Sequence, residues 1–378
     1  MRKVSIIQRE IPHYRVRFFE ELYTQGRLQG LDIQVYAGTP PAQTTSSTAF
    51  PHQFLPVRQF GKRTSGSFWM CGLEKAITGS DIVVAPQELQ CLTVPYLWAK
   101  RRRICKSWIW WGHGYNFQAS LRRSAATQIK EAIKRFMTRR ADGVITYTKQ
   151  GAEYWRQQGL PESRVIPYDN TIDVEGLRKA GAEIGTQQCM ELKHQLGLEG
   201  KYVLLFSGRL YAEKKVDFLL KAFALLKKSY PDVALLIIGD GEERDNLEQM
   251  ATRLDRQDVH FLGELLDSKE TAAYFSLADL LVIPGAVGLA IVHGFAFGLP
   301  LITTESPGHG PELEYLSRDN GAMTKIDSSQ YAETIGALLS SPHKLGAMKR
   351  SAMAQGDALH LPHSVRRFAD GIAALSQC

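Results

Sequence analysis

The stretch Leu280–Thr304, LLVIPGAVGLAIVHGFAFGLPLITT, constrains the fold of this chain more than any other. It contains no Lys, Arg, Asp or Glu, and it is long enough to span a membrane. Two prolines and four glycines interrupt it, which is rare in a continuous span. We therefore predict a buried strand, a glycine-rich turn that opens a helix, and a second buried strand. A helix N-terminus after such a turn offers free N–H groups to an anion such as a diphosphate.

The rest of the chain alternates short apolar strands with helical patterns. A weakly patterned region, Val174–Gly200, separates two such series, which we interpret as two domains. The alternation predicts parallel sheets covered by helices on both faces. Expected helices include Phe68–Ile77 and Leu121–Arg140, and the expected strands include Ser107–Trp111. Two doubly wound domains create a ligand-binding cleft at the carboxyl ends of their strands.

Composition excludes several classes of protein. With 44% hydrophobic and 22% charged residues, the chain is typical of globular proteins. The five cysteines are scattered without a CxxC pair, so neither a zinc site nor a disulfide framework is predicted. The apolar run Val4–Ile7 is too short for an export signal, and we expect a cytoplasmic protein.

Positive charge is concentrated between Lys100 and Arg140, where twelve basic residues stand against one acid, Glu131. Such a region attracts an anionic membrane surface or nucleic acid, although it could also be a solvated helix face. An apolar stripe shares the predicted helix with the cations, and no nucleic-acid-binding motif is present. We therefore expect a peripheral contact with the inner face of a membrane. Trp108, Trp110 and Trp111 are either interfacial or buried in a strand. The stripe is Ala125, Ala126, Ile129, Ile133, Phe136 and Met137, and the expected acceptor or membrane residues are Arg101, Arg102, Arg103, Lys130, Lys134 and Arg135.

Two cations follow the strand that begins the second half. The segment Phe206–Lys215 ends its strand at Gly208 and places Arg209 and Lys214 across the following turn. Such cations can clamp a diphosphate and neutralise charge on a leaving phosphate. A surface turn with solvated cations fits the spacing equally well.

Six segments occur in a known order, namely SGRLYAEKKVDFLLKAF, IIGDGEERDNLE, VHFLGEL, ADLLVIP, GAVGLAIVHGFAFGLPLITT and PGHGPELE. They resemble the C-terminal domain of the family-4 retaining glycosyltransferases, over about Tyr202–Leu338. The resemblance implies the α/β GT-B fold, two doubly wound Rossmann-like domains facing a central cleft. We expect an acceptor-binding domain over 1–173, a linker region over 174–200 and a nucleotide-sugar-binding domain over 201–358. A C-terminal helix in 359–378 is expected to pack back on the N-terminal domain.

The resemblance also implies roles for individual residues. Arg209 and Lys214 match the basic pair that holds the donor diphosphate, and His113 matches a histidine that reaches the donor sugar near the reacting carbon. Gly285–Leu289, which we call the glycine loop, matches a segment whose backbone approaches the donor. The expected donor-binding residues are Gly208, Gly285, Ala286, Val287, Gly288, Leu289, His293 and Glu312.

The chain departs from the family pattern at two positions. Gly285 and His293 stand where the family has two glutamates eight positions apart. The glutamate in the helix normally accepts hydrogen bonds from ribose hydroxyls. An imidazole could accept one such bond, or His293 could be a satisfied buried histidine. The change indicates either altered donor contacts or a loss of catalysis.

Other kinds of site have little support. Gly239-Asp-Gly241 begins a dinucleotide fingerprint, but Arg244 stands at the position of the third glycine. His360 and His363 lack a carboxylate or cysteine partner in the sequence, and there is no Asp-x-Asp motif. We therefore expect no metal and no cofactor beyond the donor substrate.

These features predict a retaining, metal-independent hexosyltransferase. We expect it to move a hexose from a nucleotide-diphosphate sugar to a hydroxyl of a lipid-linked glycan, in the synthesis of a cell-surface polysaccharide such as lipopolysaccharide. Its partners would be the nucleotide sugar, the glycan acceptor and an anionic membrane surface. The alternatives are a catalytically inactive protein of the same fold that binds nucleotide sugars or glycans, and a nucleotide-sugar epimerase.

Overall fold

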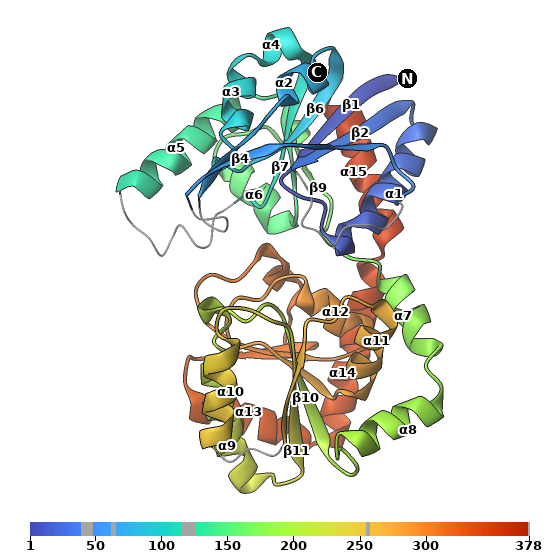
Figure 1. The fold of residues 1–378 in the computed structure, drawn as a ribbon, viewed down its shortest axis with the longest axis vertical. Coiled ribbons are helices and arrows are strands. Elements are labelled where there is room, and N and C mark those ends of the chain that lie inside the picture. The colour runs from blue at the N-terminus through green and yellow to red at the C-terminus, as the bar shows by residue number, and fades with distance from the viewer. Residues whose placement is uncertain (39–47, 62–65, 115–124, 255–257, 377–378) are drawn as a thin grey trace. The chain divides into compact units, whose positions relative to one another are not determined.

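The computed structural model describes residues 1–38, 48–61, 66–114, 125–254 and 258–376. It contains two compact units (Figure 1). Unit 1 consists of Met1–Ile172 together with Leu361–Cys378, and unit 2 consists of Asp173–His360. Each unit is an α/β domain built on one parallel sheet.

The sheet of unit 1 has the strand order β3-β2-β1-β6-β7-β8-β9, with parallel pairing throughout. The order reverses between β1 and β6, so the carboxyl ends of these strands mark the point at which such sheets bind ligands. A separate antiparallel hairpin is formed by β4 and β5. The strands are β1 (Arg2–Gln8), β2 (Leu31–Gly38), β3 (His52–Leu55), β4 (Val57–Phe60), β5 (Ser67–Met70), β6 (Ser80–Pro86), β7 (Cys105–Gly112), β8 (Gly143–Thr146) and β9 (Val165–Pro167).

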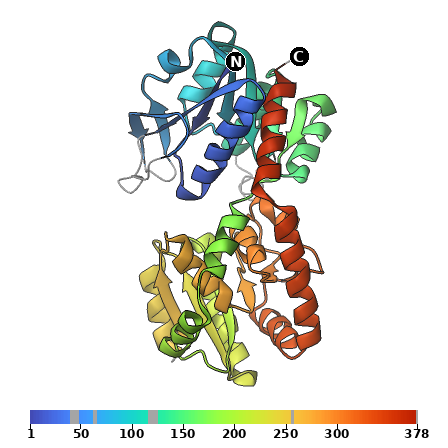
Figure 2. The same ribbon diagram turned by 90° about the vertical axis from the view of Figure 1, so that its right-hand side faces the viewer.

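Both faces of this sheet are buried. Successive side chains of each strand point to opposite sides, so each strand contributes to the core on both faces. Ile6, Ile109 and Trp111 pack against α1 and α15, while Trp108 and Trp110 pack against α2, α3, α5 and α6. Figure 2 shows the last helix, α15, beside the first, α1. The helices are α1 (His13–Leu28), α2 (Leu73–Ile77), α3 (Thr93–Ala99), α4 (Arg101–Ile104), α5 (Ala125–Arg139), α6 (Lys149–Gln157) and α15 (Leu361–Leu375).

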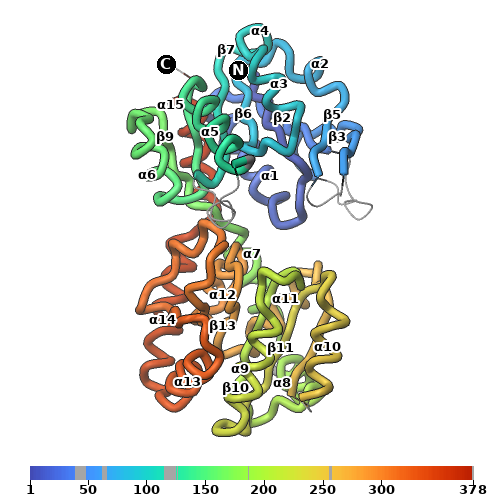
Figure 3. Tube along the Cα trace, turned by 90° about the vertical axis from the view of Figure 1, so that its left-hand side faces the viewer, coloured from blue at the N-terminus to red at the C-terminus, as the bar shows by residue number. Residues whose placement is uncertain are grey.

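Unit 2 repeats this architecture with the strand order β12-β11-β10-β13-β14-β15. Its order reverses between β10 and β13, which are parallel neighbours. Figure 3 follows the chain through β10, β11, β13 and the surrounding helices. The strands are β10 (Tyr202–Ser207), β11 (Val233–Ile238), β12 (Val259–Gly263), β13 (Leu280–Val282), β14 (Leu301–Thr304) and β15 (Gly321–Thr324). The helices are α7 (Val174–Ala182), α8 (Thr186–Gln195), α9 (Val216–Ser229), α10 (Arg244–Arg253), α11 (Ser268–Leu277), α12 (Ala290–Ala296), α13 (Ser328–Leu339) and α14 (Pro342–Ala358).

Two segments differ from the expectation, and a third lies partly outside the described residues. The predicted helix Phe68–Ile77 is wrong in its first half, because Ser67–Met70 pairs with β4 and only Leu73–Ile77 is helical. Residues 174–200 contain the helices α7 and α8 of unit 2 rather than a separate linker. The helix expected over Leu121–Arg140 is confirmed over Ala125–Arg139, and residues 121–124 lie outside the described part of the chain.

The stretch Leu280–Thr304 does not form a membrane span. It is divided into β13, the glycine loop, α12 and β14, and both strands are fully buried in the sheet of unit 2. Within the described residues, no helix combines the length and the apolar character that crossing a bilayer requires.

Candidate functional site

The glycine loop follows β13 at the carboxyl edge of the unit 2 sheet. Its first residue, Gly285, lies against the short 3-10 turn Ala212–Lys214 that follows β10. The N–H of Gly285 donates to the carbonyl of Lys214 at 3.2 Å, and the N–H of Ala286 donates to the carbonyl of Glu213 at 2.8 Å. A Cβ atom on Gly285 would lie 2.1 Å from the oxygen of Glu213. The position is therefore closed to any side chain, including the glutamate that the family pattern places there.

The other side of the glycine loop is held by residues that follow β14. The N–H of Val287 donates to Nδ1 of His309 at 3.1 Å, while Nε2 of His309 donates to the carbonyl of Thr304 at 2.9 Å. These two bonds define a neutral imidazole, and burial lowers the pKa of His309. The N–H of Gly310 donates to the carbonyl of Val287 at 2.6 Å. His309 had no predicted role, although its place between two glycines after a buried strand was a usable signal.

Lys214 lies under the glycine loop. Its side chain is only 8% exposed, and its Nζ donates to the carbonyl of Ala286 at 2.5 Å. It makes no salt bridge within the described residues. Burial lowers its pKa to about 8, and the charge of Glu312, itself buried, partly opposes this shift. A buried ammonium group with no ion pair is well suited to binding an anion.

The turn after β10 completes this edge of the sheet. Gly208 has φ +153°, and a Cβ there would lie 3.4 Å from Nζ of Lys214. A Cβ on Gly239, which follows β11, would lie 2.0 Å from the carbonyl oxygen of Gly208, so the two strand ends approach too closely for larger residues. Arg209, the next residue, is exposed and forms no salt bridge with the described residues. The two predicted cations thus lie beside Gly208, Lys214 buried and Arg209 exposed.

The N-terminal end of α12 offers donors to a ligand. The N–H groups of Gly288, Leu289 and Ala290 donate to no acceptor in the described part of the chain, as is usual in the first turn of a helix. His293 lies one turn further along, where its Nδ1 is 3.3 Å from the carbonyl of Leu289 and its ring contacts Phe275. The side chain of His293 is half-buried, and its Nδ1 lies within hydrogen-bonding distance of a carbonyl of its own helix. The structure therefore brings the predicted donor-binding residues together at this edge of the unit 2 sheet. His309 lies among them as a support of the glycine loop.

His113 lies in unit 1, directly after β7. Its ring packs edge-on against Tyr147 with the ring centroids 4.2 Å apart. Burial among protein atoms lowers its pKa, and the charges of Arg15 and Lys134 lower it further. His113 is exposed to solvent, so its desolvation is partial, but both cations act in the same direction. A neutral imidazole at this position can donate or accept one hydrogen bond.

The expected membrane residues divide into two groups. Arg102, Arg103, Lys130 and Arg135 are exposed, whereas Arg101 is half-buried against Trp98. Lys134 points inward, bonding to the carbonyl of Gly114 at 3.0 Å and to Glu131 at 3.2 Å, and it lines a small pocket with Gln87 and Trp110. An interfacial role for the three tryptophans is wrong, since Trp108, Trp110 and Trp111 are all buried strand residues.

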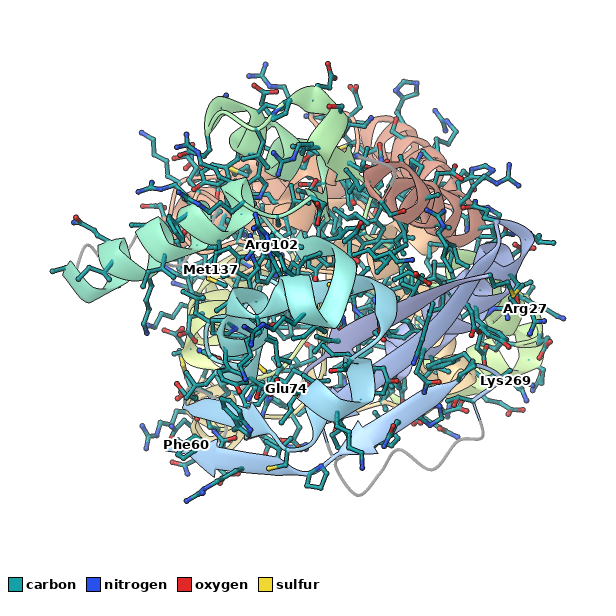
Figure 4. All side chains as sticks on the ribbon, turned by 90° about the horizontal axis from the view of Figure 1, so that it is seen from above. Arg27, Phe60, Glu74, Arg102, Met137 and Lys269 are labelled. Atoms are coloured by element: carbon teal, nitrogen blue, oxygen red, sulfur yellow. The ribbon has the colours of Figure 1, made fainter. Side chains whose placement is uncertain are left out.

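Three apolar side chains of α5 reach the surface. Ile129, Ile133 and Phe136 are 60%, 44% and 49% exposed, while Met137 turns into the core. Arg140 lies over the ring of Phe136, 3.9 Å from its centroid. Figure 4 shows α5 with Met137 labelled, together with Arg102 on α4. These apolar side chains lie on the surface beside cations, so packing in the core does not account for them.

Comparison with known proteins agrees with this geometry. The profile of the family Glycosyl transferases group 1 matches residues 201–341. An uncharacterized glycosyltransferase of Haemophilus influenzae is 30% identical over 38% of this chain and 41% of its own length. The alpha-monoglucosyldiacylglycerol synthase of Streptococcus pneumoniae is 30% identical over 48% of this chain and 41% of its own. The chain thus spans less than half the length of these curated relatives.

Solved structures match along almost the whole chain. HepE of Anabaena in complex with UDP has a TM-score of 0.75 at 17% identity, covering 99% of this chain and 100% of that one. WaaG, a glycosyltransferase of lipopolysaccharide biosynthesis, has a TM-score of 0.69 at 17% identity, covering 97% and 98%. These likenesses show the GT-B fold. The part of the chain that resembles the group 1 glycosyltransferases, residues 201–341, includes the glycine loop and Lys214.

Proposed function

We propose that this protein transfers a hexose from a nucleotide-diphosphate sugar to a hydroxyl group of a glycan acceptor, with retention at the anomeric carbon and without a metal. The observation that carries the proposal is the buried ammonium of Lys214 beneath the glycine loop, at the switch point of the unit 2 sheet. HepE was solved with UDP and with UDP-glucose, which supports a donor of this class.

The site offers a donor three kinds of contact. Lys214 and Arg209 supply positive charge to the diphosphate. The N–H groups of Gly288, Leu289 and Ala290 supply hydrogen bonds and the positive end of a helix dipole. The chain lacks the two glutamates of the family pattern, but Glu312 is a buried carboxylate whose charge acts on Lys214. We propose that it contributes to binding of the donor in their place.

The proposed reaction needs no protein nucleophile. The bond between the anomeric carbon and the diphosphate oxygen breaks, and the acceptor oxygen bonds to that carbon on the same face. The proton of the acceptor hydroxyl passes to the departing phosphate oxygen, whose negative charge is stabilised by Lys214 and Arg209. His113 would contact the sugar near the reacting carbon as a neutral hydrogen-bonding group.

The activity can be tested with two variants and one matched control. Lys214→Ala and Arg209→Ala should each reduce the transfer rate about 10²–10³-fold, as for other removed groups that stabilise a developing negative charge. Lys221→Ala removes an exposed lysine on α9 that pairs with Asp217, and it should leave the rate unchanged. Equal rates in wild type and both site variants would contradict the proposal. Full activity in a chelator would agree with independence from metals.

Product analysis distinguishes the alternatives. A nucleotide-sugar epimerase would convert the donor into its epimer in the absence of any acceptor. A catalytically inactive binding protein would have a higher melting temperature in the presence of its nucleotide sugar, but it would release no nucleotide diphosphate. A ligand at 100 times its Kd stabilises by about 2.7 kcal/mol, so a thermal-shift screen of nucleotide sugars can also identify the donor.

We further propose that the acceptor is lipid-linked and that unit 1 meets the anionic inner face of the membrane through α5. Ile129, Ile133 and Phe136 would enter the interface while Lys130 and Arg135 contact the headgroups. Each such cation contributes about 1 kcal/mol. The double variant Ile133→Gln/Phe136→Gln should lose sedimentation with anionic vesicles, and Gln128→Ala on the same helix should retain it. Equal binding of the wild type to neutral vesicles would contradict the proposal.

A further inference from the structure

A cluster of polar and aromatic side chains occupies the carboxyl edge of the unit 1 sheet. Arg15 comes from the first turn of α1, just after β1. Tyr147 directly follows β8, and Tyr168 directly follows β9. Because β1 borders the point where the strand order reverses, this edge is where a doubly wound sheet binds its ligand. Arg15 has no role in the reaction proposed above.

Arg15 is buried, and no carboxylate of the described residues pairs with it. The residue is only 9% exposed. Its guanidinium carbon lies over two rings, 4.9 Å from the centroid of Trp111 and 5.3 Å from that of Tyr147. It forms no salt bridge with any described residue. Its two hydrogen bonds are long, at 3.5 Å to the hydroxyl of Tyr168 and 3.4 Å to Oδ1 of Asn170.

These contacts do not balance the charge of the guanidinium. A buried ion costs several kcal/mol unless a counter-ion or strong hydrogen bonds compensate it. Oδ1 of Asn170 already accepts a short bond, 2.6 Å, from the hydroxyl of Tyr168. The amide is also a neutral acceptor, and bonds near 3.5 Å are at the limit of useful geometry. The five N–H donors of Arg15 therefore match an oxyanion better than the groups that now surround them.

Other charges near this edge leave it positive. Lys134 acts on the ring of His113 together with Arg15. The acid that pairs with Lys134 is Glu131. Glu88 follows β6, and its charge adds to the raised pKa of Tyr147, of which burial is the main cause. Desolvation raises the pKa of Glu88 itself, while Arg9 opposes this shift and Glu10 adds to it. None of these acids forms a salt bridge with Arg15 in the described part of the chain.

We propose that Arg15 is the centre of an oxyanion-binding site in unit 1, which holds a phosphate or carboxylate group of the acceptor. Tyr168 and Asn170 hold the guanidinium in place, and Trp111 and Tyr147 fix its plane by stacking. The assignment to the acceptor rests on the proposed transferase function, whereas the oxyanion site itself rests only on unit 1.

Inorganic phosphate is the probe for the site, followed by NMR of the His113 ring at constant pH and ionic strength. His113 is a suitable reporter because its ring packs on Tyr147, over which Arg15 lies. Phosphate should shift the His113 resonances in the wild type and in Lys214→Ala, which removes the cation of unit 2. The shift should be lost in Arg15→Gln, with chloride as the control anion.

A second variant keeps the test decisive if Arg15→Gln fails to fold. Asn170→Asp changes one atom group and places a permanent carboxylate 3.4 Å from the guanidinium. Because this carboxylate supplies the missing counter-ion, Asn170→Asp should raise the melting temperature and weaken phosphate binding at least tenfold. Unchanged phosphate affinity in Asn170→Asp would overturn the inference, as would a wild-type response that disappears in Lys214→Ala.

Steady-state kinetics identify the source of the oxyanion. Arg15→Lys should raise the KM for an anionic acceptor at least tenfold and leave the KM for the nucleotide sugar unchanged. A rise in the donor KM alone would assign the oxyanion to the donor and overturn the acceptor assignment. Transfer activity without a phosphate response would overturn this inference alone. A phosphate response in a protein that transfers no sugar would overturn the proposed function alone.

Discussion

Replacement of Gly285 by alanine tests whether packing excludes a side chain from the start of the glycine loop. The new Cβ would lie 2.1 Å from the oxygen of Glu213 and 2.5 Å from the carbonyl carbon of Lys214. Ordinary contacts are about 3.5 Å, so the loop or the Ala212–Lys214 turn must move by about 1 Å. That movement breaks the bonds from Gly285 to Lys214 and from Ala286 to Glu213.

The expected loss of stability follows from these contacts. Two hydrogen bonds contribute about 0.5–1.5 kcal/mol each, and forced overpacking costs about 1–3 kcal/mol. Gly285→Ala should therefore destabilise unit 2 by about 2–6 kcal/mol. Gly288→Ala is the matched control, since nothing lies within 4 Å of a Cβ at that position of the same loop. It should change the free energy of unfolding by less than about 0.5 kcal/mol.

Calorimetry and fluorescence together assign the effect to the correct unit. All six tryptophans lie in unit 1, so their fluorescence does not report unit 2 directly. Gly285→Ala should lower a calorimetric transition while the midpoint of the tryptophan transition remains near that of the wild type. Wild-type stability in Gly285→Ala, or equal destabilisation by Gly288→Ala, would refute the packing argument. Gly285→Glu, which restores the family residue, should weaken donor binding rather than improve it.

Two further predictions concern pH and the support of the glycine loop. Because burial lowers the pKa of Lys214 to about 8, its charge is lost above that pH, and the Kd for a nucleotide diphosphate should rise up to tenfold per pH unit. Lys214→Arg should flatten this profile, and a flat wild-type profile would contradict the assignment. His309→Leu leaves the N–H of Val287 and the carbonyl of Thr304 without partners, and chemical denaturation should show a loss of about 2–4 kcal/mol. The pKa of His309 is lowered on folding, so the unfolded state binds the proton first, and wild-type stability should fall as the pH drops below about 6.5. Stability in His309→Leu that still follows the wild-type pH profile would assign the effect to another group.

Much of the architecture could be predicted because it depends on local patterns. The apolar strands on either side of the glycine loop lie where the pattern placed them, since chargeless runs bounded by proline and glycine favour buried parallel strands. The helix predicted over Phe68–Ile77 failed for a non-local reason. Ser67–Met70 pairs with Val57–Phe60, and no local spacing reveals that partner. The GT-B assignment came from the order of six motifs, which the fold comparison supports.

The sequence by itself determined the class of fold, the family that residues 201–341 resemble and the chemical types of residue at the site. Only the tertiary structure decided that Gly285 cannot carry a side chain and that His309 supports the loop. It also decided that Lys134 points inward and that Arg15 is a buried cation with no counter-ion among the described residues. The physical reason is that a residue's chemistry and periodicity are local properties. Close backbone approach, burial and charge balance depend on strands that are distant in sequence and meet only in the folded sheet.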